Sequence, residues 1–269
     1  MRLFGSGLRK LVRRPATWLT LGLLIGLLGL ILVAVGATAN DRRADPDGGN
    51  ALLLLTFPLA YGFVLGFILG LGGLFAVIYG AAVAGSEWGW GTLKNAVARG
   101  ESRSRYVVAT FAGVALLTGI GLLVAFAAGV ALAVVGANLA GVSTAGLDDA
   151  ATLRTLPENL ARGWLAIAEE GAIGFAIATI ARSQLAGIGA GIAFFFGEQF
   201  AGIFLPDIVK YLPFDAATAM VAGGLPGSFG DGGGGSSLDA GAALAVVVAW
   251  LVGSIVVAAL FTERAEISG

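Results

Sequence analysis

The sequence predicts an all-α integral membrane protein built on six transmembrane helices. Of its 269 residues, 57% are hydrophobic and 12% are charged, and the mean hydropathy is +0.90. A water-soluble globule of this composition would expose apolar patches far larger than soluble proteins carry. The charged residues are concentrated in short stretches between long apolar runs. This pattern predicts membrane-spanning helices joined by polar loops.

Two residue types that many catalytic and metal sites require are absent. The sequence contains no cysteine and no histidine. Disulfides and thiolate metal sites are therefore excluded, and so are the commonest metal ligand and the commonest general base. An intramembrane protease is disfavoured, because no paired aspartates lie in a predicted span. We expect no catalytic residue, metal or cofactor on this chain.

Residues 1–14 predict a short amphipathic helix at the membrane surface, which Pro15 would end. Apolar residues share one side at helical spacing, and five basic residues lie elsewhere: Arg2, Arg9, Lys10, Arg13 and Arg14. Each basic residue would gain on the order of 1 kcal/mol from anionic lipid. The alternative is a solvated basic tail that only sets the topology.

The first two spans follow from long uncharged runs. Residues 18–38 predict a helix of about 32 Å, which is long enough to cross the hydrocarbon core. Residues 51–86 are too few for two crossings and a loop, so they predict one long span that begins near Pro58. Four glycines in this span form a small-residue stripe for helix packing, or simply reflect the glycine-rich composition: Gly62, Gly66, Gly70 and Gly73.

Four more spans follow. A third span is expected in about the first 30 residues of the uncharged run 106–147. After a polar stretch, the fourth, fifth and sixth spans are predicted at 164–181, 185–205 and 240–262, and Arg182 to Gln184 would form a tight turn.

The segment 206–239 is predicted to be an extracellular loop with short helices that dip into the outer leaflet. Asp215 is expected to be the N-cap of one of these helices, which Gly223 and Gly224 would end. The glycine-rich run of this segment predicts a flexible loop, because no lysine follows it as in a phosphate-binding loop.

The distribution of charge predicts the orientation of the spans. One set of loops and termini carries eleven basic residues against four acids, and the other carries five against ten. Basic residues concentrate on the cytoplasmic side of membrane proteins. Both termini are therefore expected in the cytoplasm, and the protein in the cytoplasmic (inner) membrane of a bacterium.

The stretch "GSEWGWGTLKNAVARGESRSRYV", residues 85–107, is the longest polar interruption in the first half of the chain. Glu87 closes the second span, and glycines turn the chain. A short helix then resumes at "TLKNAVA", for which Thr92 is a plausible cap. The positive-inside rule places this helix on the cytoplasmic face, across the membrane surface.

This stretch resembles the cytoplasmic loop of type-2 ATP-binding-cassette (ABC) permeases, the membrane subunits of a large class of exporters. In that family the second span ends in a glutamate-containing elbow, followed by Gly-Thr and a coupling helix that docks into the ATPase subunit. Further similarities are the basic N-terminal helix, "RSQ" after the fourth span and "YLPFDAATAM" before the last span. The resemblance covers most of the chain and implies one permease domain over 1–269.

The resemblance implies that a coupling loop at 86–105 transmits ATPase motion to the membrane. The residues that would carry this role are Glu87, Trp88, Trp90, Gly91, Thr92, Leu93 and Lys94. Many relatives carry Arg or Lys where Gly89 stands. The two tryptophans would then either replace a polar docking contact or fix the elbow at the interface. The alternative is an ordinary basic loop with interfacial tryptophans.

The ATPase is expected on a separate polypeptide. No G-x-x-x-x-G-K-[ST] motif occurs, and no lysine follows a glycine. ATP and Mg would therefore bind the partner. Six spans are half of a translocation unit in this family, which implies two ATPase subunits and either a second copy or a related permease. Membrane lipid is the remaining expected partner, and no nucleic acid is expected.

Three acidic residues fall within predicted spans: Glu169, Glu170 and Glu198. A carboxylate at mid-bilayer costs about 2.5 to 3.5 kcal/mol, so each should be protonated, paired, or facing water or a substrate path. They are candidates for lining a substrate path, or for structural contacts with the external helices. They also leave open an ion-coupled secondary carrier, and a membrane scaffold or sensor is a third possibility.

Overall fold

The computed structural model describes residues 2–39, 51–221 and 238–265. Helices account for nearly all of this part of the chain, which contains no strand. Six of its helices are long and apolar enough to cross a membrane. The predicted fold class is confirmed to this extent, and the chain is a multi-pass, all-α membrane protein.

The described helices follow one another with short connections. In chain order they are α1 (Arg2–Val12), α2 (Pro15–Ala37), the 3-10 turn η1 (Leu53–Leu55), α5 (Leu59–Gly89), α6 (Thr92–Ala98), α7 (Arg103–Ala140), α8 (Ala150–Ala181), α9 (Gln184–Phe204), α10 (Pro206–Val209), α11 (Pro213–Val221) and α12 (Ala240–Arg264).

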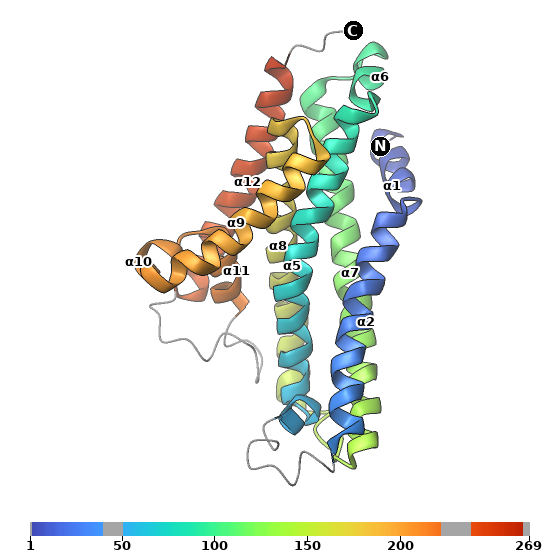
Figure 1. The fold of residues 1–269 in the computed structure, drawn as a ribbon, viewed down its shortest axis with the longest axis vertical. Helices are drawn as coiled ribbons and strands as arrows, with labels where there is room; N and C mark the ends of the chain where they lie inside the picture. The colour runs from blue at the N-terminus through green and yellow to red at the C-terminus, as the bar shows by residue number, and fades with distance from the viewer. Residues whose placement is uncertain (1, 40–50, 222–237, 266–269) are drawn as a thin grey trace.

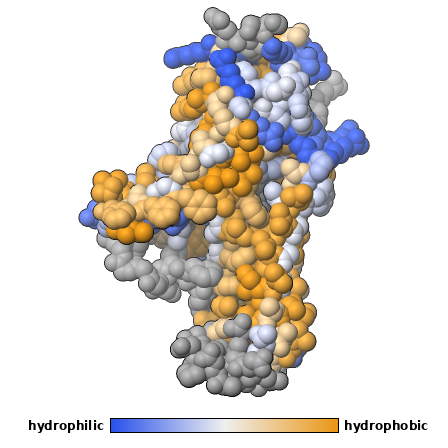
Figure 2. Space-filling view, in the orientation of Figure 1, coloured by the Kyte–Doolittle hydropathy of each residue, from blue (hydrophilic) through white to orange (hydrophobic). Residues whose placement is uncertain are grey.

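The bundle is elongated, and α2, α5, α7 and α8 run along its length (Figure 1). α1, α6 and the last turn of α12 lie together at one end, which we call the α6 end. α9 slopes away from this end, and α10 and α11 lie about half-way along the long axis. Hydrophobic residues cover much of the sides, and hydrophilic residues gather at the α6 end (Figure 2).

α5 and α8 pack along each other through glycines that allow close backbone approach. A Cβ atom on Gly80 of α5 would clash with the carbonyl oxygen of Gly171, and one on Gly174 of α8 would clash with that of Val77. The predicted glycine stripe is wrong at Gly70, which faces open space. The glycine spacing correctly indicated that α5 packs closely on another helix, but it identified only some of the glycines that face that helix.

α7 and α8 are longer than predicted. α8 begins at Ala150 rather than at residue 164, and its first half includes Pro157. Asp149 caps it by accepting a hydrogen bond of 2.8 Å from the Thr152 amide. A hydrogen bond from the Thr152 hydroxyl, together with the one from the amide, lowers the pKa of Asp149. α7 has 38 residues, or about 57 Å at the usual rise, against a hydrocarbon core of about 30 Å. Both helices can therefore extend beyond a bilayer, where polar residues are tolerated.

Two other boundaries bear on the prediction. Pro15 does end the first helical segment, but it also begins α2, since proline suits the first position of a helix. The turn at Arg182 is confirmed: its backbone is left-handed with φ of 50°, and Ser183 caps α9 through the Ala186 amide at 3.3 Å. The expected helix end at Gly223 and Gly224 and the glycine-rich run lie outside the described residues.

Candidate functional site

The short helix α6 connects α5 to α7 at one end of the elongated bundle (Figure 1). α5 ends at Gly89 with Trp90 as its C-cap, and Gly91 has φ of 64°, a left-handed conformation that glycine adopts without steric cost. Leu93 and Ala96 of α6 are buried, whereas Lys94, Asn95, Ala98 and Arg99 are exposed. α6 is therefore a surface helix with one face packed on the bundle and one face accessible.

Glu87 is buried beside α6 and accepts hydrogen bonds from four side chains. Oε1 lies 2.7 Å from Lys10 Nζ and 3.1 Å from Arg14 Nη2. Oε2 accepts from the Tyr106 hydroxyl at 2.5 Å and from the Thr92 hydroxyl. We call these five residues the Glu87 cluster. They come from α1, the α1–α2 junction, α5, α6 and α7, so one carboxylate connects all of these elements.

The cluster changes the interpretation of two N-terminal basic residues. Lys10 and Arg14 were expected to face lipid headgroups, but they bind Glu87, and Arg14 Nη1 also donates to Ser86 Oγ at 2.8 Å. Leu11, between them in sequence, is 2% exposed and packs in the core cluster that contains Val107 of α7. α1 is thus attached to the bundle by ion pairs and by apolar packing.

The two tryptophans of the elbow have different surroundings. Trp88 is partly buried, and the guanidinium of Arg182 lies over its ring at 5.3 Å. Trp90 is 65% exposed, with the guanidinium of Arg14 at 5.0 Å from its ring centre. Such cation–π contacts contribute about 0.5 to 1 kcal/mol at exposed sites. Trp88 therefore fixes the elbow to the α8–α9 turn, and Trp90 remains accessible at the surface.

The segment after α6 is attached to the last helix of the chain. Arg103 Nη1 donates to the carbonyl oxygens of Glu263 at 3.1 Å and of Ala265 at 2.7 Å. The Glu263 side chain in turn accepts from the Ser104 amide at 3.0 Å. A cation at the C-terminal end of a helix satisfies carbonyls that have no partner within the helix. α6 is consequently connected to α12 as well as to α1.

Some of the predicted site residues meet, and others have different roles. Glu87 and Thr92 are in contact, but Thr92 is the first residue of α6 rather than its N-cap, and its hydroxyl donates to Glu87. The prediction missed Lys10, Arg14 and Tyr106. One signal was present, since a carboxylate that ends an apolar run needs a counter-charge, but the sequence does not indicate which basic residues supply it.

Three acidic residues that were predicted to lie within spans, Glu169 and Glu170 of α8 and Glu198 of α9, are 12 to 14 positions from the α8–α9 turn. Glu169 is 0% exposed, Glu170 5% and Glu198 3%. Glu170 contacts α5 at Gly73. Among the described residues, neither oxygen of Glu169 has a hydrogen-bond partner, nor has Oε2 of Glu170 or of Glu198. These three glutamates form a buried acidic group that no described basic side chain neutralises.

Glu198 also has a structural role. Its Oε1 accepts from the backbone amide of Asp215 at 2.7 Å, in the first turn of α11. Asp215 was expected to be the N-cap of this helix, but it lies inside it, and the capping acceptor comes from α9. Burial raises the pKa of Asp215. A contact between Glu198 and the short helix α11 agrees with the structural alternative considered for this residue.

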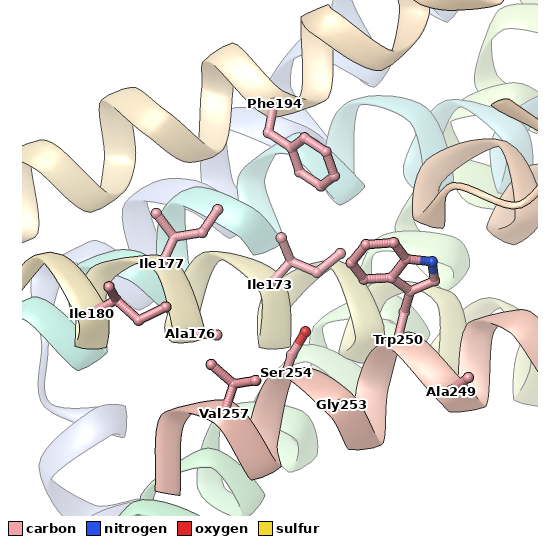
Figure 3. A pocket seen from close by; sticks show the side chains of 10 residues that line it. All are labelled: Ile173, Ala176, Ile177, Ile180, Phe194, Ala249, Trp250, Gly253, Ser254 and Val257. Carbon is pink, nitrogen blue, oxygen red and sulfur yellow. The ribbon is translucent and has the colours of Figure 1, made fainter. Parts of the chain in front are cut away.

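An apolar pocket of about 550 Å³ lies between α8, α9 and α12 (Figure 3). Ile173, Phe194 and Trp250 point toward one another across it, and Ser254 is its most polar side chain (Figure 3). Trp250 is oriented by a hydrogen bond of 3.0 Å from Nε1 to the carbonyl oxygen of Tyr211. None of the three buried glutamates lines this pocket.

The described residues contain no group of three or more acidic side chains placed to hold a metal ion. In comparisons with known proteins, the chain matches no family model and no curated protein.

Proposed function

We propose that this protein is the membrane-spanning permease subunit of an ATP-driven exporter of the ABC class. The observation that carries the proposal is α6, a surface helix joined to several membrane helices through the buried Glu87. The energy source would be a separate ATPase, because the chain has no phosphate-binding motif of its own. Two ATPase subunits and a second permease would complete the transporter.

α6 has the features that docking to a soluble partner requires. Its exposed face presents Asn95, Ala98 and Arg99, with Trp90 beside them at the end of α5. Its buried face, Leu93 and Ala96, packs on the bundle. Because α6 is packed on the bundle, a partner that bound its exposed face and displaced it would also displace the helices that α6 contacts.

The Glu87 cluster supplies the mechanical connection in this proposal. Displacing α6 would displace Thr92 and, through Glu87, also Lys10 of α1 and Tyr106 of α7. Small shifts at one site become larger helix movements where packed elements have two discrete arrangements. Closure of the ATPase dimer would thus be transmitted to α2, α5 and α7. No residue of this chain takes part in the chemistry of hydrolysis.

A second candidate function rests on the buried acidic group. Glu169 is fully buried with both oxygens unpartnered among the described residues, which is a costly arrangement inside a membrane. An ion-coupled carrier would use such carboxyls to bind and release protons. This alternative predicts transport driven by a pH gradient without ATP.

The test is co-purification of the tagged protein with the ATPase encoded beside it in the genome, followed by ATPase rates of the complex in liposomes. Asn95→Glu and Arg99→Glu change only the exposed face of α6, and Arg105→Glu, an exposed arginine at the start of α7, is the matched control. We expect the α6 variants to lose the complex and the control to keep it. A Glu87→Ala, Thr92→Ala double variant should bind but lose regulation of ATPase activity by the permease.

The co-purification and a proton-flux measurement together separate the exporter from the ion-coupled carrier. If no ATPase binds, or if the α6 variants behave as the wild type, the exporter proposal fails. Proton flux into dye-loaded liposomes under a pH gradient then tests the carrier. A flux that disappears in Glu169→Gln and persists in Glu158→Gln, an exposed acid on the same helix, would support ion coupling.

A further inference from the structure

A second pocket, of about 390 Å³, opens at the α6 end beside the last two turns of α12. The residues that line it are Arg182, Val257, Leu260, Phe261, Arg264 and Ala265. Arg182 comes from the α8–α9 turn, and the other five come from α12 or follow it. The pocket therefore combines two arginines with an apolar wall.

Arg182 is held in place by its surroundings. Its guanidinium lies 5.3 Å from the ring centre of Trp88 and 5.3 Å from that of Phe261. Its backbone has φ of 50°, a left-handed conformation that favours glycine. A guanidinium stacked on aromatic rings keeps its N–H donors at the edge of its plane, where they can meet an anion.

Neither arginine is neutralised within the described part of the chain. Arg182 and Arg264 are both exposed, and neither forms an ion pair with a described acidic residue. Two guanidinium groups that line one pocket without a carboxylate are complementary to a phosphate, which accepts hydrogen bonds from several donors at once.

The apolar wall indicates that the anion is part of an amphiphile. Val257 is 46% exposed and Leu260 52% exposed, and both lie on α12, a helix apolar enough to cross a membrane. Arg264 is the last residue of this helix and Arg182 lines the same pocket from the α8–α9 turn, at the level where hydrocarbon gives way to headgroups and water. A ligand that fits has a phosphate level with the arginines and a hydrocarbon chain along α12.

We propose that this pocket binds an anionic phospholipid of the surrounding membrane, with the phosphate between Arg182 and Arg264 and an acyl chain against Val257 and Leu260. Basic pockets between transmembrane helices recognise anionic headgroups in this way. Because Arg182 also stacks on Trp88, the bound lipid connects α12 and the α8–α9 turn to the end of α5. This inference does not depend on the proposed transport function.

The test is native mass spectrometry of the purified protein with phosphatidylglycerol or phosphatidylcholine of identical acyl chains. We expect preferential binding of phosphatidylglycerol, with affinity reduced about fivefold by Arg182→Gln or Arg264→Gln and about 25-fold by both together. Arg154→Gln is the matched control, because Arg154 is exposed near the opposite end of α8 and forms no ion pair among the described residues. It should bind like the wild type.

Two further measurements distinguish a lipid site from a site for free anions and from a loss of fold. Inorganic phosphate and glycerol phosphate, added in excess, should displace bound phosphatidylglycerol only weakly. If they displace it as strongly as unlabelled phosphatidylglycerol does, the pocket is a site for free anions instead. Arg264→Glu leaves the stacked Arg182 untouched and should abolish the lipid preference while the protein stays monodisperse in size-exclusion chromatography. Equal binding of the two lipids by the wild type, or a preference retained in the double variant, would overturn the proposal.

Discussion

Lys10 Nζ lies 2.7 Å from Glu87 Oε1, although 77 positions separate the two residues in sequence. This ion pair fastens the N-terminal helix to the end of α5, directly beside the surface helix α6. The side chain of Glu87 is 8% exposed and that of Lys10 is 33% exposed. Removing one partner from such a site leaves the other charge without compensation in a place that water reaches poorly.

Glu87→Ala should therefore destabilise the protein. Breaking a buried pair costs about 3 to 5 kcal/mol, and the partial exposure of Lys10 places the expected loss near the lower limit, about 3 kcal/mol. Thermal unfolding in detergent measures the change. Glu101→Ala, an acid of the same loop with no ion pair among the described residues, is the control. Equal unfolding temperatures for the two variants would show that the cluster adds no stability.

A double-mutant cycle on Arg14 and Trp90 should reveal their contact. The guanidinium lies 5.0 Å from the ring centre, and the ring is 65% exposed. We expect a coupling free energy of about 0.5 to 1 kcal/mol between Arg14→Ala and Trp90→Ala. Chemical denaturation of the two single variants and the double variant measures it. Strict additivity would mean that the stack makes no net contribution.

Arg103→Gln should loosen the last turn of α12. The arginine donates to the carbonyl oxygens of Glu263 and Ala265, and hydrogen bonds that involve a charged group contribute about 1.5 to 3 kcal/mol. Hydrogen exchange of peptides covering 258–265 should become faster, with little change in α2. Arg105→Gln, in which an exposed neighbour is changed, should exchange like the wild type. Unchanged exchange in the Arg103 variant would argue against the cap.

Gly80→Ala and Gly70→Ala should have opposite effects, although both replace a glycine of α5. A Cβ on Gly80 would clash with the backbone of α8, and overpacking of this kind costs about 1 to 3 kcal/mol. Gly70 faces open space, where alanine favours the helix by up to about 1 kcal/mol. Thermal unfolding of the pair tests the α5–α8 contact, and a Gly80 variant as stable as the Gly70 variant would contradict it.

Glu198→Leu should destabilise α11, whereas Glu198→Gln should not. The carboxylate accepts from the Asp215 amide at 2.7 Å, and a glutamine oxygen can take over that bond. Loss of a capping acceptor costs about 1 kcal/mol. Hydrogen exchange of 213–221 measures the result. Similar exchange in both variants would show that the hydrogen bond does not hold the helix.

The six spanning helices could be predicted because a long apolar run has one solution in a membrane, a helix that satisfies its own backbone. The full lengths of α7 and α8 could not. Arg154, Glu158 and Pro157 are typical of a loop, yet they lie on α8, and Glu158 pairs with Arg162 one turn further along the same helix. A helix that extends past the bilayer returns to water, where charged residues are compatible with it.

The candidate site was predicted in part. Glu87 and Thr92 were identified from a local motif, because the end of a span and the start of a short helix leave local signals. Lys10, Arg14 and Tyr106 could not be assigned to Glu87, since periodicity along a helix does not indicate which helix it meets. The cap of α11 was misassigned for the same reason: the acceptor, Glu198, belongs to a different helix.

The Glu87 cluster also has a consequence for biosynthesis. Lys10 and Arg14 are made first, Glu87 follows at the end of the second span α5, and Tyr106 at the start of the third span α7. At about 5 to 20 residues per second, several seconds separate the first and last members. During that interval Lys10 and Arg14 lack the Glu87 carboxylate and are available to lipid headgroups. The cluster can therefore close only once α5 and the first turn of α7 have been made.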